Sequence, residues 1–251
     1  MSHQESVGTH PLWDLPVVGS VHADTILVTW LVMVLGIAFF WWIGASYRSH
    51  LVNKRQTTLE LIVDYMSDLA VSTLGPGGEP FVPFVICLFL FIFMLNQIGL
   101  FPLQQLGFGY GDVRVGGSPT ADLNTTVGLA IMVFLLVHIT AIRKHGLGYY
   151  KHLFQPFPVL FPINLIEMLN APITLSLRLF GNIFAGEILL FIIASIIVSH
   201  ITIGPVNVSL AATVMPIAVL FFNLIVGSLQ AFVFTLLTIV YLMNPLAEES
   251  H

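Results

Sequence analysis

The sequence predicts an all-α membrane protein with five membrane-crossing helices and one further amphipathic helix at the bilayer surface. Hydrophobic residues make up 57% of the 251 residues and charged residues only 8%, against about a quarter charged in a soluble globular protein. The apolar residues form runs long enough to cross a bilayer, and most cations lie in two loops between those runs. We therefore treat residues 1–251 as a single membrane domain.

The charge, cysteine and histidine content exclude several classes of partner. A net charge of −5 with eight Lys and Arg leaves no basic patch for nucleic acid. The one cysteine, Cys87, lies in an apolar run, so we expect neither a disulfide framework nor a thiolate metal site. The nine histidines show no metal-binding spacing in the apolar runs, and we expect no haem, zinc or other cofactor. His138, close to Arg143, is interpreted as an interfacial or hydrogen-bonded side chain.

The N-terminal segment, residues 1–25, is polar and carries Glu5 and Asp14, without the basic start and short apolar core of a secretory signal. We expect this segment to lie outside the membrane. Residues 26–46 follow with 21 residues and no charge, and about 20 residues suffice for a helix to cross the bilayer. They are predicted to form the first span and to act as an uncleaved insertion signal.

Residues 57–74 are predicted to form an amphipathic helix in the membrane interface. Glu60, Asp64 and Asp68 recur every four residues and share one helix face. Apolar side chains largely occupy the other face: Leu61, Ile62, Tyr65, Leu69 and Val71. The alternative is a helix of a small soluble domain, but only about thirty residues lie between the flanking apolar runs.

Two further spans follow a glycine- and proline-rich break at residues 75–78. Residues 80–103 and residues 123–142 are apolar runs of spanning length. Residues 107–120 between them are rich in glycine and turn-forming residues and are predicted to form an exposed loop.

The positive residues predict the orientation. Six of the eight cations fall in two loops that are separated by two spans: Arg48, Lys54, Arg55, Arg143, Lys144 and Lys151. Loops rich in Lys and Arg face the cytoplasm, so the N-terminus is expected outside. With an outside turn at Gly204 and Pro205, the chain crosses five times and its C-terminus lies in the cytoplasm.

The last two predicted helices, residues 160–200 and 208–244, are too long for a perpendicular crossing. At 1.5 Å per residue each would reach on the order of 54 Å, whereas the hydrocarbon core is about 30 Å thick. Either prolines kink these helices, or they lie strongly inclined as a long hairpin. An inclined hairpin would present a flat wall to another subunit.

Arg178 is an isolated charge in this apolar region, with no other cation within 25 residues on either side. A buried guanidinium costs at least about 2.5–3.5 kcal/mol at mid-membrane on insertion scales, and it stays charged. It must therefore face an anion or a wet cavity. The alternative is an arginine that snorkels to the interface, but apolar sequence extends for several turns on both sides.

Glu187 and three amides are the other candidate site residues at this depth. Asn182 lies one turn from Arg178, whereas Glu187 is nine residues on and points to the opposite side, about 13 Å along the axis. Glu187 is a candidate for a group that takes up and releases protons. Alternatively, its carboxylate could pair with a residue of another helix. Asn223 and Gln230 are seven residues apart and share a face; they could instead bond neighbouring helices.

Several motifs resemble subunit a of F-type ATP synthases. They are residues 177–182 (LRLFGN), 185–187 (AGE), 229–234 (LQAFVF), 119–124 (PTADLN) and 164–167 (NLIE). The amphipathic segment and the long final hairpin are also what the family's fold implies. The resemblance implies a non-catalytic stator subunit in the plasma membrane of a bacterium. Its implied partners are the c-subunit ring, the b subunits of the peripheral stalk and the rest of the complex.

The resemblance also implies a role for each candidate residue. Arg178 would attract the ionised carboxylate of a c subunit and bar protons from leaking between two aqueous half-channels. Glu187 would belong to the outer half-channel, with Asn182 and Gln230 beside Arg178. Asp122 and Asn124 would help to form the outer entrance and Glu167 the inner exit. At Asn223 some family members have a histidine, and asparagine does not titrate.

Two other functional classes compete with this interpretation. An ion-coupled secondary transporter could use Arg178 for an anionic substrate, but such folds usually contain inverted repeats, and the sequence shows no internal duplication. An intramembrane enzyme would need a nucleophile and a base, or metal ligands, at depth. No such set is evident in the sequence.

Overall fold

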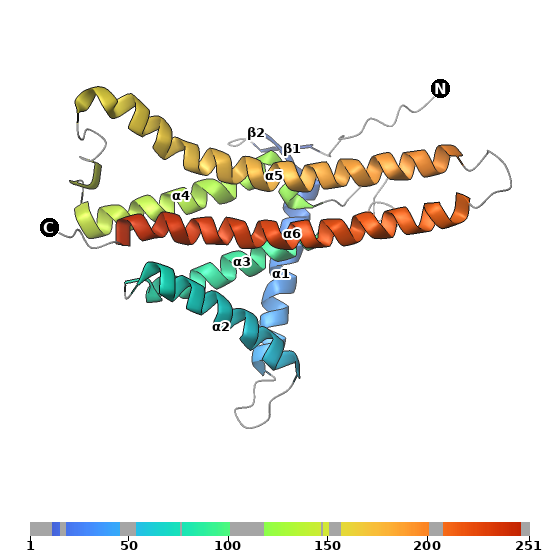
Figure 1. The fold of residues 1–251 in the computed structure, drawn as a ribbon, viewed down its shortest axis with the longest axis horizontal. Coiled ribbons are helices and arrows are strands. Elements are labelled where there is room, and N and C mark those ends of the chain that lie inside the picture. Colours follow the sequence, from blue (N-terminus) through green and yellow to red (C-terminus); the bar gives the residue numbers. More distant parts are fainter. Residues whose placement is uncertain are drawn as a thin grey trace.

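The computed structural model describes residues 12–15, 19–45, 54–75, 77–100, 118–146, 148–150, 157–200 and 208–246. Over these residues the fold is helical apart from one short pair of strands (Figure 1). The main elements are β1 (Leu12–Leu15), β2 (Gly19–His22), α1 (Ala23–Ala45), α2 (Lys54–Leu74), α3 (Val82–Ile98), α4 (Leu123–His145), α5 (Phe161–His200) and α6 (Val208–Leu246). Single 3-10 turns precede α3, α4 and α5: η1 (Glu79–Phe81), η2 (Pro119–Ala121) and η4 (Pro158–Leu160).

The strand pair departs from the predicted all-helical fold. β1 and β2 run antiparallel with Leu12 opposite His22 and Leu15 opposite Gly19, and β2 leads directly into α1. Strands of four residues are too short for an alternating pattern to stand out in a polar segment. The sequence therefore predicted only a polar segment outside the membrane here.

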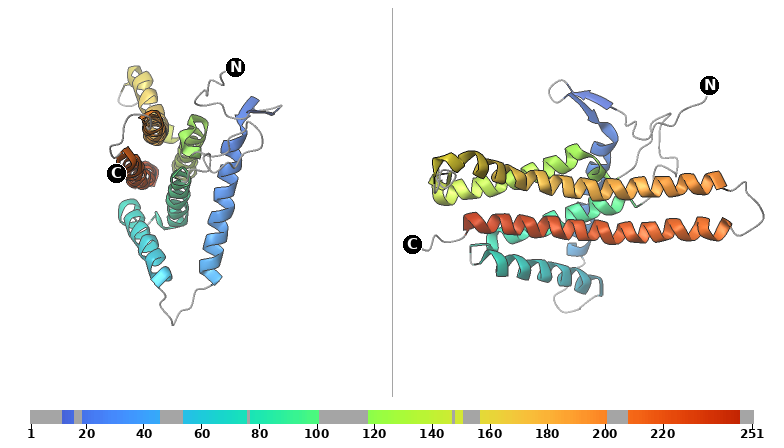
Figure 2. Two further views of the ribbon diagram at one scale, coloured as in Figure 1. Left: turned by 90° about the vertical axis from the view of Figure 1, so that its right-hand side faces the viewer. Right: turned by 45° about the horizontal axis from the view of Figure 1, so that its top comes forward.

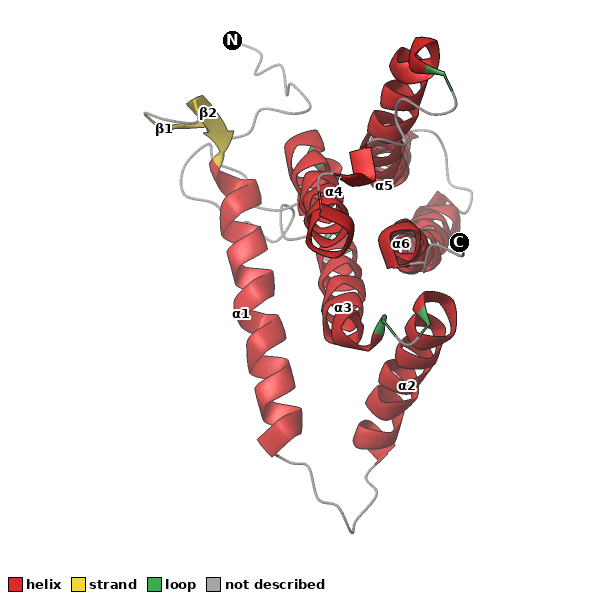
Figure 3. Ribbon diagram, turned by 90° about the vertical axis from the view of Figure 1, so that its left-hand side faces the viewer, coloured by secondary structure: helices red, strands yellow, loops and turns green. Residues whose placement is uncertain are grey.

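The long helices α5 and α6 lie side by side and run in opposite directions (Figures 1 and 2). They have 40 and 39 residues, so each is about 60 Å long. Pro172 lies inside α5, which continues through it. Helix α1 lies crosswise to this pair, as the view along α5 and α6 in Figure 3 also shows. Helices α3 and α4 pack between α1 and the pair (Figure 3).

The apolar core lies among α2, α3, α4, α5 and α6. Side chains from all five helices are almost fully buried there, among them Met66, Ile92, Val133, Leu175, Leu179, Ile239 and Leu242. On α2 the buried line is Met66, Ala70 and Leu74, while Asp64 and Asp68 on the neighbouring face are exposed. The acidic and buried faces of the predicted amphipathic helix are thus separate, although Leu61 and Tyr65 are exposed as well.

Several helix ends differ from the predicted spans by a few residues. Helix α3 ends at Ile98, and residues 101–103 of the predicted span lie outside the described residues. The chain turns at Gly99 because it packs against Ser118; a Cβ at Gly99 would lie 2.6 Å from the Ser118 Cβ. Helix α4 runs to His145 rather than 142 because its final cations have partners. The Lys144 Nζ donates to the Leu246 carbonyl oxygen at 2.6 Å.

Four helical segments of the described chain are long and apolar enough to cross a membrane: Thr25–Trp42, Glu79–Ile98, Leu123–His145 and Ile217–Leu246. This is the composition of a multi-pass membrane protein. Helix α5 is not among them, so its crossing, the fourth of the five in the predicted topology, stays a prediction. On α1 the side chains of Trp30, Val34 and Ile37 are largely exposed, as expected for a surface that meets lipid.

Candidate functional site

Arg178 lies on the exposed face of α5. The buried positions Leu175, Leu179 and Ile183 recur every four residues and pack towards the core, so Arg178 and Asn182 project away from that core. Leu177 beside Arg178 is 52% exposed. No hydrogen bond or ion pair reaches Arg178 from any residue that the structure describes. A permanent cation thus stands beside Asn182 on a mostly apolar surface of the isolated chain.

Helices α5 and α6 are in close contact at Gly186 and Asn223. A Cβ at Gly186 of α5 would lie 2.6 Å from the Asn223 Oδ1. The Asn223 Nδ2 donates to the Gly186 carbonyl oxygen at 3.4 Å. Counting eight residues along each antiparallel helix from this contact brings Arg178 level with Ala231, next to Gln230. The half-buried Gln230 therefore lies at a similar height to Arg178 along the helix pair, and its role beside Arg178 stays a prediction.

Glu187 points to the other side of α5, as its spacing from Arg178 predicted. It is half-buried, and its Oε1 accepts a hydrogen bond from the Ser118 backbone N–H at 2.7 Å. A cavity of about 20 Å³, here the small cavity, lies beside it. This volume holds about one water molecule. The small cavity is lined by Asn96, Gly99, Leu100, Ser118, Asn182, Ile183, Glu187, Asn223 and Val226.

The small cavity brings together three of the predicted site residues, Asn182, Glu187 and Asn223. Asn182 is exposed on the Arg178 side and also lines the small cavity, so it lies between the arginine and the carboxylate. Asn223 fills the space that Gly186 leaves open. Its bond to Gly186 means that the alternative role, joining two helices, is also fulfilled.

Sequence reasoning missed a set of buried polar residues next to Glu187. The Thr120 Oγ1 donates to the Asn96 Oδ1 at 2.7 Å, and the Asn96 Nδ2 donates to the Gly227 carbonyl oxygen at 2.8 Å. The Ser118 Oγ lies 2.6 Å from the Thr120 Oγ1 and donates to the Leu95 carbonyl oxygen at 2.9 Å. The available signal was Asn96, a polar residue within an apolar run. A buried polar group needs hydrogen-bond partners, so its presence predicts other polar residues nearby.

Asp122 and Asn124 lie where the polar segment enters α4. Asp122 caps this helix: its Oδ1 accepts from the Asn124 backbone N–H at 2.8 Å. The Thr25 Oγ1 of α1 donates to the Asp122 Oδ2 at 3.4 Å. A capping role stabilises the helix start by itself. The structure does not bring Asp122 or Asn124 into the lining of the small cavity, although both follow Ser118 closely in sequence.

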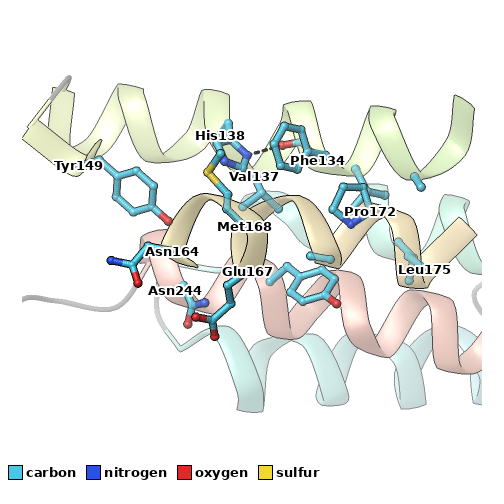
Figure 4. A pocket seen from close by; sticks show the side chains of 14 residues that line it. Phe134, Val137, His138, Tyr149, Asn164, Glu167, Met168, Pro172, Leu175 and Asn244 are labelled. Atoms are coloured by element: carbon cyan, nitrogen blue, oxygen red, sulfur yellow. Dashed lines mark hydrogen bonds between the residues drawn. The ribbon is translucent and has the colours of Figure 1, made fainter. Parts of the chain in front are cut away.

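Glu167 lines a second, separate cavity of about 460 Å³, here the large cavity, between α4, α5 and α6 (Figure 4). Tyr149, Asn164, Glu167 and Asn244 lie towards one end of the large cavity, and Pro172 and Leu175 towards the other. Glu167 itself is exposed. The large cavity is therefore an open recess with a polar end.

Two titratable groups of the large cavity have clear environments. The His138 Nδ1 lies 2.8 Å from the Phe134 carbonyl oxygen, so the histidine is hydrogen-bonded within its own helix, as expected. Burial, and then the neighbouring Tyr150, raise the pKa of Tyr149 above its usual value of 10.0. The phenol therefore stays neutral at physiological pH. Among the described residues, no group of three or more His, Cys, Asp and Glu could hold a metal ion.

Arg178 separates the two cavities along α5. It lies eleven residues after Glu167 and nine before Glu187, or about 16 Å and about 13 Å along the helix axis. Arg178 itself lines neither cavity. The site therefore consists of an exposed cation flanked by two recesses, each with one carboxylate.

Comparison with known proteins identifies the family of this arrangement. The profile of the ATP synthase A chain family matches residues 26–243. The chain is 34% identical to ATP synthase subunit a of Moorella thermoacetica over 245 residues, which cover 97% of this chain and 98% of that protein. It is also 34% identical to subunit a of Desulforamulus reducens over 92% of this chain and 82% of that protein. It is likewise 34% identical to ATP synthase subunit a 1 of Pelobacter propionicus over 91% of this chain and 90% of that protein.

Proposed function

This chain belongs to the ATP synthase A chain family, and we propose that it carries protons through the membrane sector of a bacterial F-type ATP synthase. It is a non-catalytic stator subunit. Its partners are the c-subunit ring, the b subunits of the peripheral stalk and the rest of the complex. It lies in the plasma membrane with its N-terminus outside and its C-terminus in the cytoplasm.

The observation that carries this proposal is the position of Arg178 between the small and large cavities. Each cavity is one half-channel: the small cavity with Glu187 opens towards the outside, and the large cavity with Glu167 opens towards the cytoplasm. The nearest residues of α5 that line the two cavities, Leu175 and Asn182, are about 10 Å apart along the helix axis, and Arg178 lies between them. A proton that enters one cavity therefore reaches the other only by travelling on a partner.

The partner is the c ring, whose subunits each carry one carboxylate at mid-membrane. The guanidinium of Arg178 keeps its charge and attracts this carboxylate in its ionised form. A carboxylate that has taken up a proton from the Glu187 side leaves the arginine, travels with the ring and releases the proton on the Glu167 side. Each charge that crosses 100 mV releases about 2.3 kcal/mol, which drives rotation. The exposed apolar surface around Arg178, with Leu177 and Phe184, faces the ring.

The membrane arrangement follows from the helix lengths. Helices α5 and α6, about 60 Å long, fit a hydrocarbon core of about 30 Å only when strongly inclined. Helix α1, of spanning length, lies crosswise to them (Figure 1), which supports this inclination. We place α5 as the fourth crossing, α6 as the fifth and α2 in the cytoplasmic interface. Asp122, Asn124 and the 118–121 segment lie at the outer entrance.

The two half-channels are tested by asking from which side each cavity is accessible. Cys87 is the one cysteine of the chain, so Cys87→Ser gives a background for single introduced cysteines. Asn223→Cys in the small cavity is expected to react with a charged thiol reagent added outside, and Asn164→Cys in the large cavity with reagent added inside. Reaction of both positions from the same side would overturn the proposal.

The control for this experiment is Gly128→Cys in the same background. Gly128 is exposed on α4, has open space around it and lines neither cavity. Its cysteine should face lipid and react slowly from both sides. Copurification of each variant with a ring of small c subunits shows that the complex has assembled.

A further inference from the structure

The polar residues beside Glu187 form a continuous hydrogen-bonded network across three helices. We infer that Asn96, Ser118 and Thr120 are positioning residues for Glu187: they hold the Ser118 backbone N–H against its carboxylate. This network thereby fixes the position of the Glu187 carboxylate between the outer entrance and the ring. The inference rests on the proposed function, since it assigns how the small cavity is built.

The burial of the network shows how firmly the N–H is held. Asn96 is 4% exposed, Ser118 5% and Thr120 0%. Both ends of the Asn96 amide are used, since its oxygen accepts from Thr120 and its nitrogen donates to Gly227 of α6. A half-satisfied network at this depth would be costly. The 118–120 segment is therefore tied to α3 directly and to α6 through Asn96, and Glu187 of α5 bonds to this segment.

The backbone of this segment is also confined by close packing. A Cβ at Gly99 would come within 3.0 Å of the Ser118 backbone nitrogen. The Ser118 hydroxyl donates to the Leu95 carbonyl oxygen, one turn before Gly99 on α3. The Ser118 N–H is thus left directed at the Glu187 Oε1, 2.7 Å away.

The bond from the network to Glu187 identifies its role as positioning rather than proton relay. It is made by a backbone N–H, which keeps its proton at any accessible pH. The Ser118 hydroxyl donates to the Leu95 carbonyl oxygen and the Thr120 hydroxyl donates to the Asn96 Oδ1, and the two hydroxyl oxygens lie 2.6 Å apart. These hydroxyls orient the Ser118 N–H but do not themselves transfer a proton that moves through the small cavity.

Threonines elsewhere in the chain give a matched control. Thr235 is as buried as Thr120, at 0% exposure, but its hydroxyl donates to the Ala231 carbonyl oxygen of its own helix at 2.9 Å. Replacing either threonine by valine removes one buried hydroxyl and keeps the shape. A general cost of losing such a hydroxyl would therefore appear equally in both variants.

The first experiment measures passive proton flux in vesicles that carry the membrane sector without the catalytic head, driven by a potassium diffusion potential. Thr120→Val should lower the flux about tenfold, since small misplacements of a proton-transferring group have large effects. Thr120→Ser should stay within about twofold of the wild type because its hydroxyl can make the same bond. Thr235→Val should also stay near wild type. Wild-type flux in Thr120→Val, or failure of Thr120→Ser to rescue, would overturn the inference.

A second pair of variants tests the N–H itself. The φ of Ser118 is −71°, which proline adopts without strain, so Ser118→Pro deletes the donor while Ser118→Ala keeps it. Both lose the hydroxyl. The proline variant should conduct about tenfold less than the alanine variant. Equal flux in the two would show that the N–H does not position the carboxylate.

Glu187→Gln, measured in the same assay, distinguishes failure of the positioning role from failure of the proposed function. If it blocks flux while Thr120→Val does not, the positioning role is wrong and the proposed function stands. If Glu187→Gln conducts like the wild type, the proposed outer half-channel is wrong, and the positioning role falls with it.

Discussion

The small and the large cavity are built in opposite ways although the same helix, α5, lines both. The small cavity has room for about one water, and its lining includes the buried, hydrogen-bonded Asn96 and Ser118 and the half-buried Glu187. The large cavity is some twenty times larger, its carboxylate is exposed, and eight of its fourteen lining residues are apolar. Under the proposed function, a proton in the small cavity would have to pass Glu187, whereas water in the large cavity could bypass Glu167. We therefore expect selectivity for the proton path at Glu187 and freer exchange with water at Glu167.

This difference predicts unequal effects of the same substitution. Glu187→Gln keeps the shape and loses titration, so passive proton flux should fall on the order of a hundredfold. Glu167→Gln should lower it only about twofold, because water in the large cavity offers other routes. The measurement is flux in vesicles without the catalytic head, with assembly checked by copurification of the c ring. Equal losses in the two variants would remove the distinction between the cavities.

The close approach of α5 and α6 at the small cavity gives the next prediction. Gly186→Ala puts a methyl group 2.6 Å from the Asn223 Oδ1, so the helices must separate or Asn223 must move. We expect a cost of about 1–3 kcal/mol in stability and about a tenfold loss of flux. Thermal unfolding of the purified complex and flux in vesicles measure the two effects.

Gly128→Ala is the matched control for Gly186→Ala. Both glycines lie within long helices, but a Cβ at Gly128 meets nothing within 4 Å. This substitution should leave flux unchanged and stabilise the helix slightly, by up to about 1 kcal/mol. If both variants lost flux equally, helix spacing at Asn223 would not be the cause.

The smallest expected effect concerns Tyr149 in the large cavity. Burial and Tyr150 raise the pKa of its phenol. The phenol is therefore neutral at every pH from 6 to 9. A raised pKa moves the loss of its proton further above this range. Tyr149→Phe should therefore leave the pH dependence of flux unchanged. A shift of the alkaline limb in this variant would show that the phenol titrates there.

The sequence predicted the elements that depend on long patterns. Helices α1, α4, α5 and α6 begin within three residues of the predicted limits because unbroken apolar runs define them. The opposite orientation of Arg178 and Glu187 also followed from helix geometry alone. The family was predicted from the motifs around Arg178 and is confirmed by the match over residues 26–243.

Other features depend on contacts between distant segments, which no local pattern records. The end of α3 is set by Gly99 packing against Ser118, and the network of Asn96, Ser118 and Thr120 forms only when α3, α5 and α6 meet. Asn223 was predicted for its polarity, but its fit against Gly186 depends on the helix register. The β1–β2 pair was missed because four-residue strands leave too weak a signal.

The central claim, that an uncompensated cation between two half-channels couples the ring to proton flow, is tested most directly at Arg178. The measurement is ATP-driven proton pumping into vesicles by assembled complexes. Arg178→Ala should assemble and lose pumping, and Arg178→Lys should lose it as well, because lysine lacks the planar fork and can release its proton when buried. Arg143→Ala, at the exposed end of α4, should pump like the wild type. Normal pumping by Arg178→Ala would contradict the account.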